Sequence, residues 1–249
     1  EAEIDFVDET FQKLRKRKAK VLREDFCGTG NSSCEWVKRR KDNVAYGVDL
    51  DEEVLGWGER NRVGRLKPGR RERVHLVNGN VLTAKTPPAD VVLAMNFSYW
   101  IFKTRQEMRS YFKSAYKHLK SDGIYFLDFY GGSDTMREMR EKRPIKGPGG
   151  LKFTYIWHQA KLEPLSGHMQ CYIHFAFPDK SKMNKAFAYD WRLWTMPEIR
   201  ELLHEAGFRK VTVYLEGTEE DTGEGDGDFQ PAEEGEADLA WIAYIVAEK

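Results

Sequence analysis

The stretch VLREDFCGTGNSSCEWV, residues 21–37, constrains the fold more than any other part of the chain. A short β-type run enters a turn with glycines at 28 and 30, and a helical pattern follows. A glycine turn between a strand and a helix lets backbone N–H groups approach a ligand closely. The stretch therefore predicts the entrance to a nucleotide-binding α/β fold. The usual first glycine of such turns is replaced by Phe26.

The alternation of strands and helices continues for the next hundred residues. Strands are expected at 43–50, 74–80, 89–97 and 124–130, and helices at 5–18, 32–41, 51–61 and 105–123. Ser32 or Ser33, with Glu35 completing a capping box, is expected to start the helix at 32–41. Gly123 is expected to end the helix at 105–123. This order predicts a parallel sheet with right-handed crossovers.

The pattern changes after residue 130. Three β-rich runs, at 151–162, 169–178 and 185–194, predict an antiparallel insertion. A helix capped by Thr195 follows, and then two strands at 209–217 and 239–249. The acidic, glycine-rich segment 218–236 between them is expected to be a long connection and a mobile lid.

Composition narrows the class of protein. The 40 basic residues balance the 40 acidic ones, which argues against a nucleic-acid partner bound through phosphate charge. The basic run at 60–73 is interpreted as a solvated loop, and the run at 13–20 is placed on the N-terminal helix near the start of the first strand. Three cysteines form no disulfide framework and favour reduced thiols in the cytoplasm. No apolar run approaches the roughly 20 residues of a membrane span, and no metal-ligand set accompanies the cysteines.

Four predicted strands end in residues that suit one ligand crevice. Asp49 ends the second strand, where a carboxylate can accept hydrogen bonds from both hydroxyls of a ribose. Asn80 follows the third strand and Asn96 the fourth. Ligands of open α/β sheets lie beyond the carboxyl ends of the strands. A dinucleotide and S-adenosylmethionine both fit such a crevice, but Ser33 stands where a dinucleotide site has its third glycine or alanine.

At these residues the chain resembles the class I S-adenosylmethionine-dependent methyltransferases. Their first motif, V-L-D-x-G-C-G-T-G, is similar to VLREDFCGTG here, with Glu24 in place of the acid. The resemblance implies an α/β, Rossmann-like, mostly parallel sheet of seven strands, with helices on both faces and the last strand antiparallel. It divides the single domain 1–249 into an N-terminal cap helix (1–20), a cofactor-binding core (21–130), a β-rich lid (131–194) covering the active site, and a final helix and strand pair (195–249).

The resemblance also assigns cofactor contacts. Asp49 matches the ribose acid, Asn80 and Val81 match the pair that borders the adenine, and Asn96 matches the residue beside the transferred methyl group. The other expected contacts to S-adenosylmethionine are Glu24, Phe26, Cys27, Gly28, Gly30 and Leu50. Glu24 or Asp25 is expected to balance the methionine ammonium, and the ring of Phe26 to form one wall of the pocket.

The lid resembles that of glycine N-methyltransferase and related small-molecule enzymes. WRLWTM is similar to their F-R-L-S-Y-Y run, so Arg192 is expected to face a substrate carboxylate. The other expected substrate contacts are Trp100, Tyr130, Trp157 and Tyr189, and the expected catalytic residues are Asn96, Tyr99 and His158. The predicted reaction is direct methyl transfer to an amine nitrogen of an amino-acid-like or carboxylate-bearing small molecule.

Several alternatives remain open at this point. NFSY, residues 96–99, is similar to the N-P-P-Y motif of nucleic-acid amino-methyltransferases, without its prolines. Methylation of a protein or nucleic-acid amino group, a non-catalytic binding module and a dinucleotide oxidoreductase are the competing functions. Phe6 and Phe11 of the first helix are expected to cap the pocket. Assembly into a homo-oligomer is possible.

Overall fold

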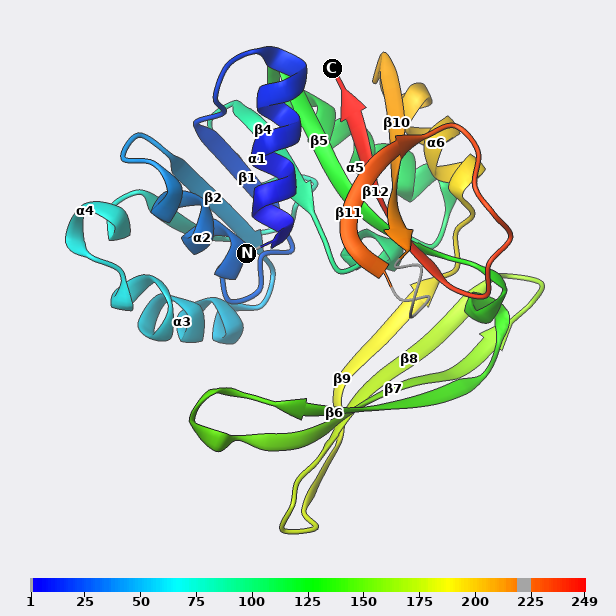
Figure 1. The fold of residues 1–249 in the computed structure, drawn as a ribbon. Helices are drawn as coiled ribbons and strands as arrows, with labels where there is room; N and C mark the ends of the chain where they lie inside the picture. Colours follow the sequence, from blue (N-terminus) through cyan, green and yellow to red (C-terminus); the bar gives the residue numbers. More distant parts are fainter. Residues whose placement is uncertain (1, 219–224) are drawn as a thin grey trace.

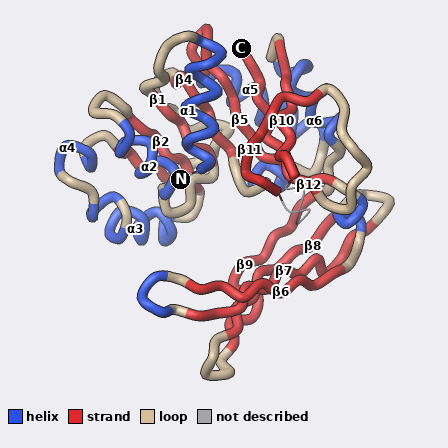
Figure 2. Tube along the Cα trace, viewed as in Figure 1, coloured by secondary structure: helices blue, strands red, loops and turns tan. Residues whose placement is uncertain are grey.

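The protein is built on two β-sheets (Figures 1 and 2). The computed structural model describes residues 2–218 and 225–249. The large sheet has the strand order β11-β10-β12-β5-β4-β1-β2-β3, and the small sheet has the order β6-β7-β8-β9. The strands of the large sheet are β1 (Val21–Asp25), β2 (Val44–Asp49), β3 (Val74–Asn78), β4 (Ala89–Ala94), β5 (Leu119–Gly131), β10 (Lys210–Thr218), β11 (Gly225–Ala232) and β12 (Trp241–Glu248).

The large sheet confirms the predicted Rossmann-like topology with one difference in strand number. Strands β1 to β5 pair in parallel, and β12 runs antiparallel between β5 and β10. An eighth strand, β11, pairs with the outer edge of β10. It lies inside the segment 218–236 that was expected to be a loop, because its charged and glycine-rich sequence has no apolar alternation. Residues 219–224 of that segment lie outside the described residues.

Helices cover both faces of the large sheet (Figure 1). They are α1 (Ala2–Arg15), α2 (Asn31–Arg39), α3 (Glu52–Asn61), α4 (Pro68–Arg71), α5 (Arg105–His118) and α6 (Met196–Ala206), with 3-10 turns at η1 (Val63–Arg65), η2 (Ser98–Ile101), η3 (Ser133–Met136) and η4 (Pro148–Gly150). Helices α1 and α2 share one apolar core with the sheet, and α5 and α6 share the other. None of these described helices is long and apolar enough to cross a bilayer.

Helix α1 does not cap the ligand crevice with its aromatic residues. Phe11 is fully buried, and the Phe6 ring stacks on Tyr244 of β12 at 4.4 Å. Both side chains are part of the core between α1, α2 and the sheet. The expectation for Phe6 and Phe11 is therefore wrong: the apolar stripe of α1 buries itself on the face of the sheet, as amphipathic surface helices do.

Helix α5 is shorter than the sequence indicates. It ends at His118, and β5 already begins at Leu119, so that Gly123 lies inside the strand. The pairing of β4 with β5 shifts register between Ala89 and Val91, and a Cβ at Gly123 would lie 2.8 Å from the Leu119 side chain. The glycine marks an irregularity in a strand rather than a helix end.

The small sheet is an antiparallel meander of β6 (Met139–Lys146), β7 (Lys152–Glu163), β8 (His168–Ala176) and β9 (Lys182–Arg192). Strand β6 was not predicted, since its sequence MREKRPIK is charged and mostly exposed. Figure 1 shows the sheet beyond the carboxyl ends of the parallel strands, where a covering insertion was expected. Met169, Cys171 and Trp191 of this sheet are buried in the same core as α5 and α6.

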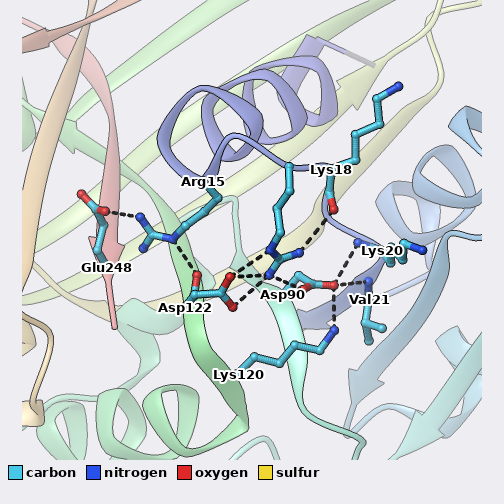
Figure 3. Close-up of polar contacts among 9 residues, drawn as sticks. Arg15, Lys18, Lys20, Val21, Asp90, Lys120, Asp122 and Glu248 are labelled. Atoms are coloured by element: carbon cyan, nitrogen blue, oxygen red, sulfur yellow. Dashed lines mark hydrogen bonds and ion pairs between the residues drawn. The ribbon is translucent and has the colours of Figure 1, made fainter.

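At the amino ends of the parallel strands, a buried carboxylate on β4 joins the segment that leads into β1 to the start of β5 (Figure 3). Asp90 Oδ2 accepts hydrogen bonds from the N–H groups of Lys20 and Val21, both at 2.9 Å. Its carboxylate also pairs with Arg17 at 2.8 Å and Lys120 at 3.0 Å. Burial disfavours its charge, but these N–H groups and cations outweigh burial and lower the pKa of Asp90.

Candidate active site

The turn between β1 and α2 has the left-handed backbone that glycine normally supplies. The φ angles of Gly28 and Gly30 are +51° and +70°, and Gly30 is the N-cap of α2. Phe26 has φ +58°, which costs an L-residue about 1–2 kcal/mol. Its half-buried ring packs on Tyr111 and Phe102, with ring centroids 5.5 and 6.2 Å away. The turn thus keeps its shape without the first glycine.

Glu24, at the carboxyl end of β1, takes the capping role that was expected of serines. Its Oε2 accepts hydrogen bonds from the Ser33 N–H at 2.9 Å and the Ser33 hydroxyl at 2.5 Å. The expected Ser32 or Ser33 cap with Glu35 is therefore wrong. Burial raises the pKa of Glu24 to about 7, the Ser33 hydroxyl opposes this rise, and the nearby Glu3 carboxylate adds to it.

Asp25 does not face the ligand side of the turn. It is almost fully buried, it pairs with Arg23 at 2.7 Å, and it accepts a hydrogen bond from the Tyr111 hydroxyl at 3.1 Å. Arg23 in turn donates to the carbonyl oxygens of Val81 and Ala84. This buried network fixes the underside of the turn. Of the two acids expected near the methionine ammonium, Asp25 is therefore engaged elsewhere, and Glu24 remains the candidate.

Asp49 joins the end of β2 to the glycine turn. Its Oδ2 accepts a hydrogen bond from the Gly28 N–H at 2.7 Å, and its Oδ1 accepts one from the Asp51 N–H at 3.0 Å. Each carboxylate oxygen retains a further lone pair that a ribose hydroxyl could use. Asp51, and not Asp49, caps α3 by accepting from the Val54 N–H. Asp49 is therefore not merely a helix cap.

The remaining expected cofactor contacts surround this turn. Cys27 is buried, and its N–H donates to the Val48 carbonyl oxygen at 3.1 Å. Leu50 is 67% exposed, and an apolar side chain exposed beside Asp49 can cover a flat ligand. Asn80 is exposed just after β3, and its Oδ1 accepts from the Leu82 N–H, whereas Val81 is buried.

The loop after β4 is held by an acid that sequence analysis did not single out. Asp128 of β5 is buried, and its two carboxylate oxygens accept hydrogen bonds from the N–H groups of Asn96 at 2.6 Å and Phe97 at 2.9 Å. Asn96 is exposed at the end of β4 and has φ +59°. The acid in the otherwise apolar run IYFLDFY was the available sequence signal for this contact, because an acid is rarely buried without a partner.

Tyr99 and Trp100 lie in the core rather than at the site surface. Both side chains are 0% exposed. The Tyr99 hydroxyl donates to the Asp128 carbonyl oxygen at 2.7 Å, and burial raises its pKa well above the usual value. The structure thus does not support the expected catalytic Tyr99 or substrate-contacting Trp100, and gives both a packing role under the loop.

Five aromatic side chains connect that loop to the small sheet. We call Phe97, Tyr130, Trp157, Tyr189 and Trp191 the aromatic cluster. Tyr189 stacks on Trp191 at 4.4 Å, and Phe97 lies 6.1 Å from Tyr130 and 6.2 Å from Trp191. Trp157 lies 6.3 Å from Trp191. Apart from buried Trp191, all are half-buried. The structure therefore brings together Tyr130, Trp157 and Tyr189, three of the residues that were expected to contact the substrate.

His158 lies on the opposite face of the small sheet from Trp157. Side chains alternate along a strand, and the His158 ring contacts His174 and Tyr172 instead of the aromatic cluster. It also lies 3.2 Å from an Arg140 nitrogen. Burial, with Arg140 and His174 adding to it, lowers the pKa of His158. The expected base therefore faces away from the strand ends, and the structure does not support that assignment.

Arg192 is already paired within the protein. It donates to Glu198 at 2.9 Å and to the Lys103 carbonyl oxygen at 3.2 Å, and its guanidinium lies 3.8 Å from the Trp194 ring centroid. Alternation along β9 places it on the other face from Tyr189 and Trp191. These contacts tie the small sheet to α6. They give the expected carboxylate-binding arginine a structural role.

The charges at the carboxyl ends of the strands fit a cationic ligand. Burial raises the pKa values of both Glu24 and Asp128 to about 7, and Glu3 adds to both shifts. Within residues 2–218 and 225–249, neither acid forms a salt bridge, and Glu3 Oε1 is buried without a hydrogen-bond partner. S-adenosylmethionine carries a sulfonium and an ammonium group beside a ribose. Glu24, beside the glycine turn, suits these groups.

Comparison with known proteins agrees with this geometry. Residues 27–125 match the family model described as a methyltransferase domain. No curated protein matches the chain significantly.

Three solved structures have the same fold. DesVI of Streptomyces venezuelae has a TM-score of 0.70 at 18% identity, over 99% of this chain and 90% of that one. CalS10 is an amino pentose methyltransferase from Micromonospora echinaspora, solved with S-adenosylmethionine. It has a TM-score of 0.69 at 16% identity, over 99% of this chain and 89% of that one. The sugar N-methyltransferase KedS8 from Streptoalloteichus sp. has a TM-score of 0.67 at 16% identity, over 100% of this chain and 87% of that one.

The family match supports the predicted methyltransferase domain, and the solved structures support the predicted fold. Residues 27–125 form a methyltransferase domain, and the whole chain has the fold of the class I S-adenosylmethionine-dependent methyltransferases.

Proposed function

We propose that the protein transfers a methyl group from S-adenosylmethionine to an amine nitrogen of a small molecule that carries a flat apolar ring face, such as an amino sugar. The observation that carries the proposal is the aromatic cluster beside unpaired acids at the strand ends. Aromatic faces offer apolar area and attract cations, so they suit both a sugar ring and its amine. Among similar structures, CalS10 is an amino pentose methyltransferase and KedS8 a sugar N-methyltransferase.

The amino sugar replaces the carboxylate-bearing acceptor favoured by the sequence. The reason is the pairing of Arg192 with Glu198, which occupies the guanidinium that would bind a substrate carboxylate. Two parallel N–H donors are what make arginine suitable for that task. With those donors engaged, we infer that the acceptor is recognised mainly by aromatic faces of Trp157, Tyr189 and Tyr130.

We assign the cofactor contacts as follows. Asp49 accepts hydrogen bonds from the ribose hydroxyls, and Glu24 balances the ammonium through the glycine turn at Gly28 and Gly30. The adenine lies against Leu50, Asn80 and Val81. Asn96 borders the sulfur, and the Phe26 ring closes the methionine end.

The reaction requires alignment of the acceptor nitrogen with the methyl group more than it requires acid–base catalysis. S-adenosylmethionine supplies an activated methyl group and a good leaving group. The protein must hold the acceptor nitrogen in line with that methyl group and exclude water. Because Tyr99 and His158 are placed elsewhere, we propose that the amine loses its proton to solvent before it binds.

Calorimetry followed by a methylation assay tests this function. We expect S-adenosylmethionine to bind with micromolar affinity, and mass spectrometry to show methylated amino sugars in preference to amino acids, peptides or oligonucleotides. Failure to bind the cofactor would make the protein a non-catalytic binding module. Preferential methylation of amino acids, with a higher KM in Arg192→Lys, would restore the carboxylate-bearing acceptor. Preferential methylation of peptides or oligonucleotides would favour a macromolecular amino group.

A further inference from the structure

Asp128 holds both ends of the loop that carries Asn96. Its side-chain oxygens accept the N–H groups of Asn96 at 2.6 Å and Phe97 at 2.9 Å. Its backbone oxygen accepts the Tyr99 hydroxyl at 2.7 Å. One residue of β5 therefore holds three residues of this loop, Asn96, Phe97 and Tyr99, at the carboxyl end of β4.

The loop needs such a clamp because its backbone is unfavourable. Asn96 and Phe97 have φ angles of +59° and +54°, so two successive residues other than glycine are left-handed. Asparagine tolerates this conformation, but for phenylalanine it costs about 1–2 kcal/mol. Hydrogen bonds to a charged acceptor contribute roughly 1.5–3 kcal/mol each, which is enough to offset that cost.

We propose that Asp128 is a positioning residue for methyl transfer, whose ionised carboxylate holds the 96–97 turn so that Asn96 faces the reacting sulfur and Phe97 faces the acceptor. This role rests on the proposed function. Asp128 itself touches neither reactant: it acts through the two amides that it binds.

The surroundings of Asp128 make this clamp sensitive to pH. Burial raises its pKa to about 7, the N–H groups of Phe97 and Asn96 oppose that rise, and Glu3 of α1 adds to it. The other titratable groups that interact electrostatically with it are Tyr244, its partner on β12, Tyr99 of the loop, and Tyr125 of β5. None of these supplies a positive charge.

The direction of the effect follows from the hydrogen bonds. A proton on Asp128 places an O–H group where one of the two amides needs an acceptor. Below pH 7 the turn therefore loses a bond, and above pH 7 both bonds are present. Turnover is expected to increase as the pH rises through about 7, apart from any contribution of the acceptor amine.

Asp128→Asn tests this role, with Asp90→Asn as the matched control. Asp90 is also a buried acid that accepts two consecutive backbone N–H groups, but at the other end of the sheet. We expect Asp128→Asn to lower kcat at pH 8 about tenfold. The variant should also lose the increase in turnover that the wild type shows near pH 7. The Kd for S-adenosylmethionine should stay within about threefold, and Asp90→Asn should keep both that increase and kcat.

A second measurement needs no variant. In wild-type protein, the ¹⁵N-resolved amide resonances of Asn96 and Phe97 should shift together with a midpoint near pH 7. Amides that do not titrate, or an Asp128→Asn enzyme with the wild-type kcat and pH profile, would overturn the positioning role. If the amides titrate but no acceptor is methylated, the clamp stands as a structural contact, and the proposed function fails together with the catalytic part of this inference.

Discussion

The two ends of the parallel sheet both use buried acids to hold backbone N–H groups, but they differ in charge balance. At the amino ends, Asp90 accepts from Lys20 and Val21 and is paired with Arg17 and Lys120 (Figure 3). At the carboxyl ends, Glu24 and Asp128 accept from similar amides, and the described structure pairs them with no cation. The pKa of Asp90 is lowered, whereas the other two are raised to about 7.

This difference separates a structural end of the sheet from a functional one. A carboxyl group with a lowered pKa stabilises the fold above its unfolded pKa, and that contribution is lost as the pH falls through its folded value. Acids with raised pKa values behave in the opposite way, because the folded state then binds more protons than the unfolded state. Glu24 and Asp128 should therefore reduce stability as the pH rises from about 4 to about 7. A cationic ligand would remove that cost.

The largest effect is expected at the amino end. Asp90→Ala removes the acid shared by Arg17 and Lys120 and leaves two backbone N–H groups without their acceptor, at a cost of about 1–3 kcal/mol for each N–H group. Chemical denaturation at pH 7 should show that loss in the free energy of unfolding. Affinity for S-adenosylmethionine should not change in the folded fraction. An equally large loss of affinity would mean that the two ends are not separable.

Asp49→Ala should produce the next largest effect, on binding. Losing two charge-assisted hydrogen bonds to the ribose should cost about 3 kcal/mol or more, which lowers affinity for S-adenosylmethionine about 100-fold or more. Asp51→Ala is the matched control: it removes the α3 cap, at about 1 kcal/mol of stability, and leaves affinity unchanged. Unaltered affinity in Asp49→Ala would refute the ribose assignment.

Glu24→Gln should separate charge from hydrogen bonding at the carboxyl end. The amide oxygen can still accept from Ser33, but the charge facing the ammonium is lost, so affinity at pH 8 should fall roughly tenfold. The free energy of unfolding should also decline less between pH 5 and pH 8 than in wild type. A steeper decline would show that Glu24 does not carry the raised pKa.

Phe26 gives the smallest expected effect. Phe26→Gly and Phe26→Ala lose the same ring contacts, but only glycine adopts φ +58° without strain. The glycine variant should therefore be about 1 kcal/mol more stable than the alanine variant by urea denaturation. An alanine variant of equal or greater stability would indicate that the turn relaxes when the ring is removed.

The sequence predicted the frame of the fold better than its irregular parts. Alternating apolar segments, the glycine turn and the Thr195 cap identified the parallel sheet, the topology and α6 correctly. Strands β6 and β11 were not predicted, because they lie at sheet edges and are charged. Neither sequence shows the alternation of apolar and polar residues that is typical of a strand. The end of α5 was misplaced because Gly123 serves an irregularity in β5.

The sequence indicated correctly which acids lie at the strand ends, as at Glu24 and Asp49. The site was not predictable where strand register decides which way a side chain faces. His158 and Arg192 each lie one residue from an inward-facing aromatic, and that single step moves them to the other face of the small sheet. Asp128 was missed because its partners, Asn96 and Phe97, are more than thirty residues away in sequence.

The most direct test of the account is a calorimetric titration of the wild-type protein with S-adenosylmethionine at pH 6.5, in two buffers with different ionisation enthalpies. A cationic ligand beside Glu24 favours its charged form, so binding should release protons, and affinity should increase from pH 6 to pH 8. Absence of binding, or binding with proton uptake and affinity that falls over this range, would contradict the claim that Glu24 lies beside the cationic cofactor.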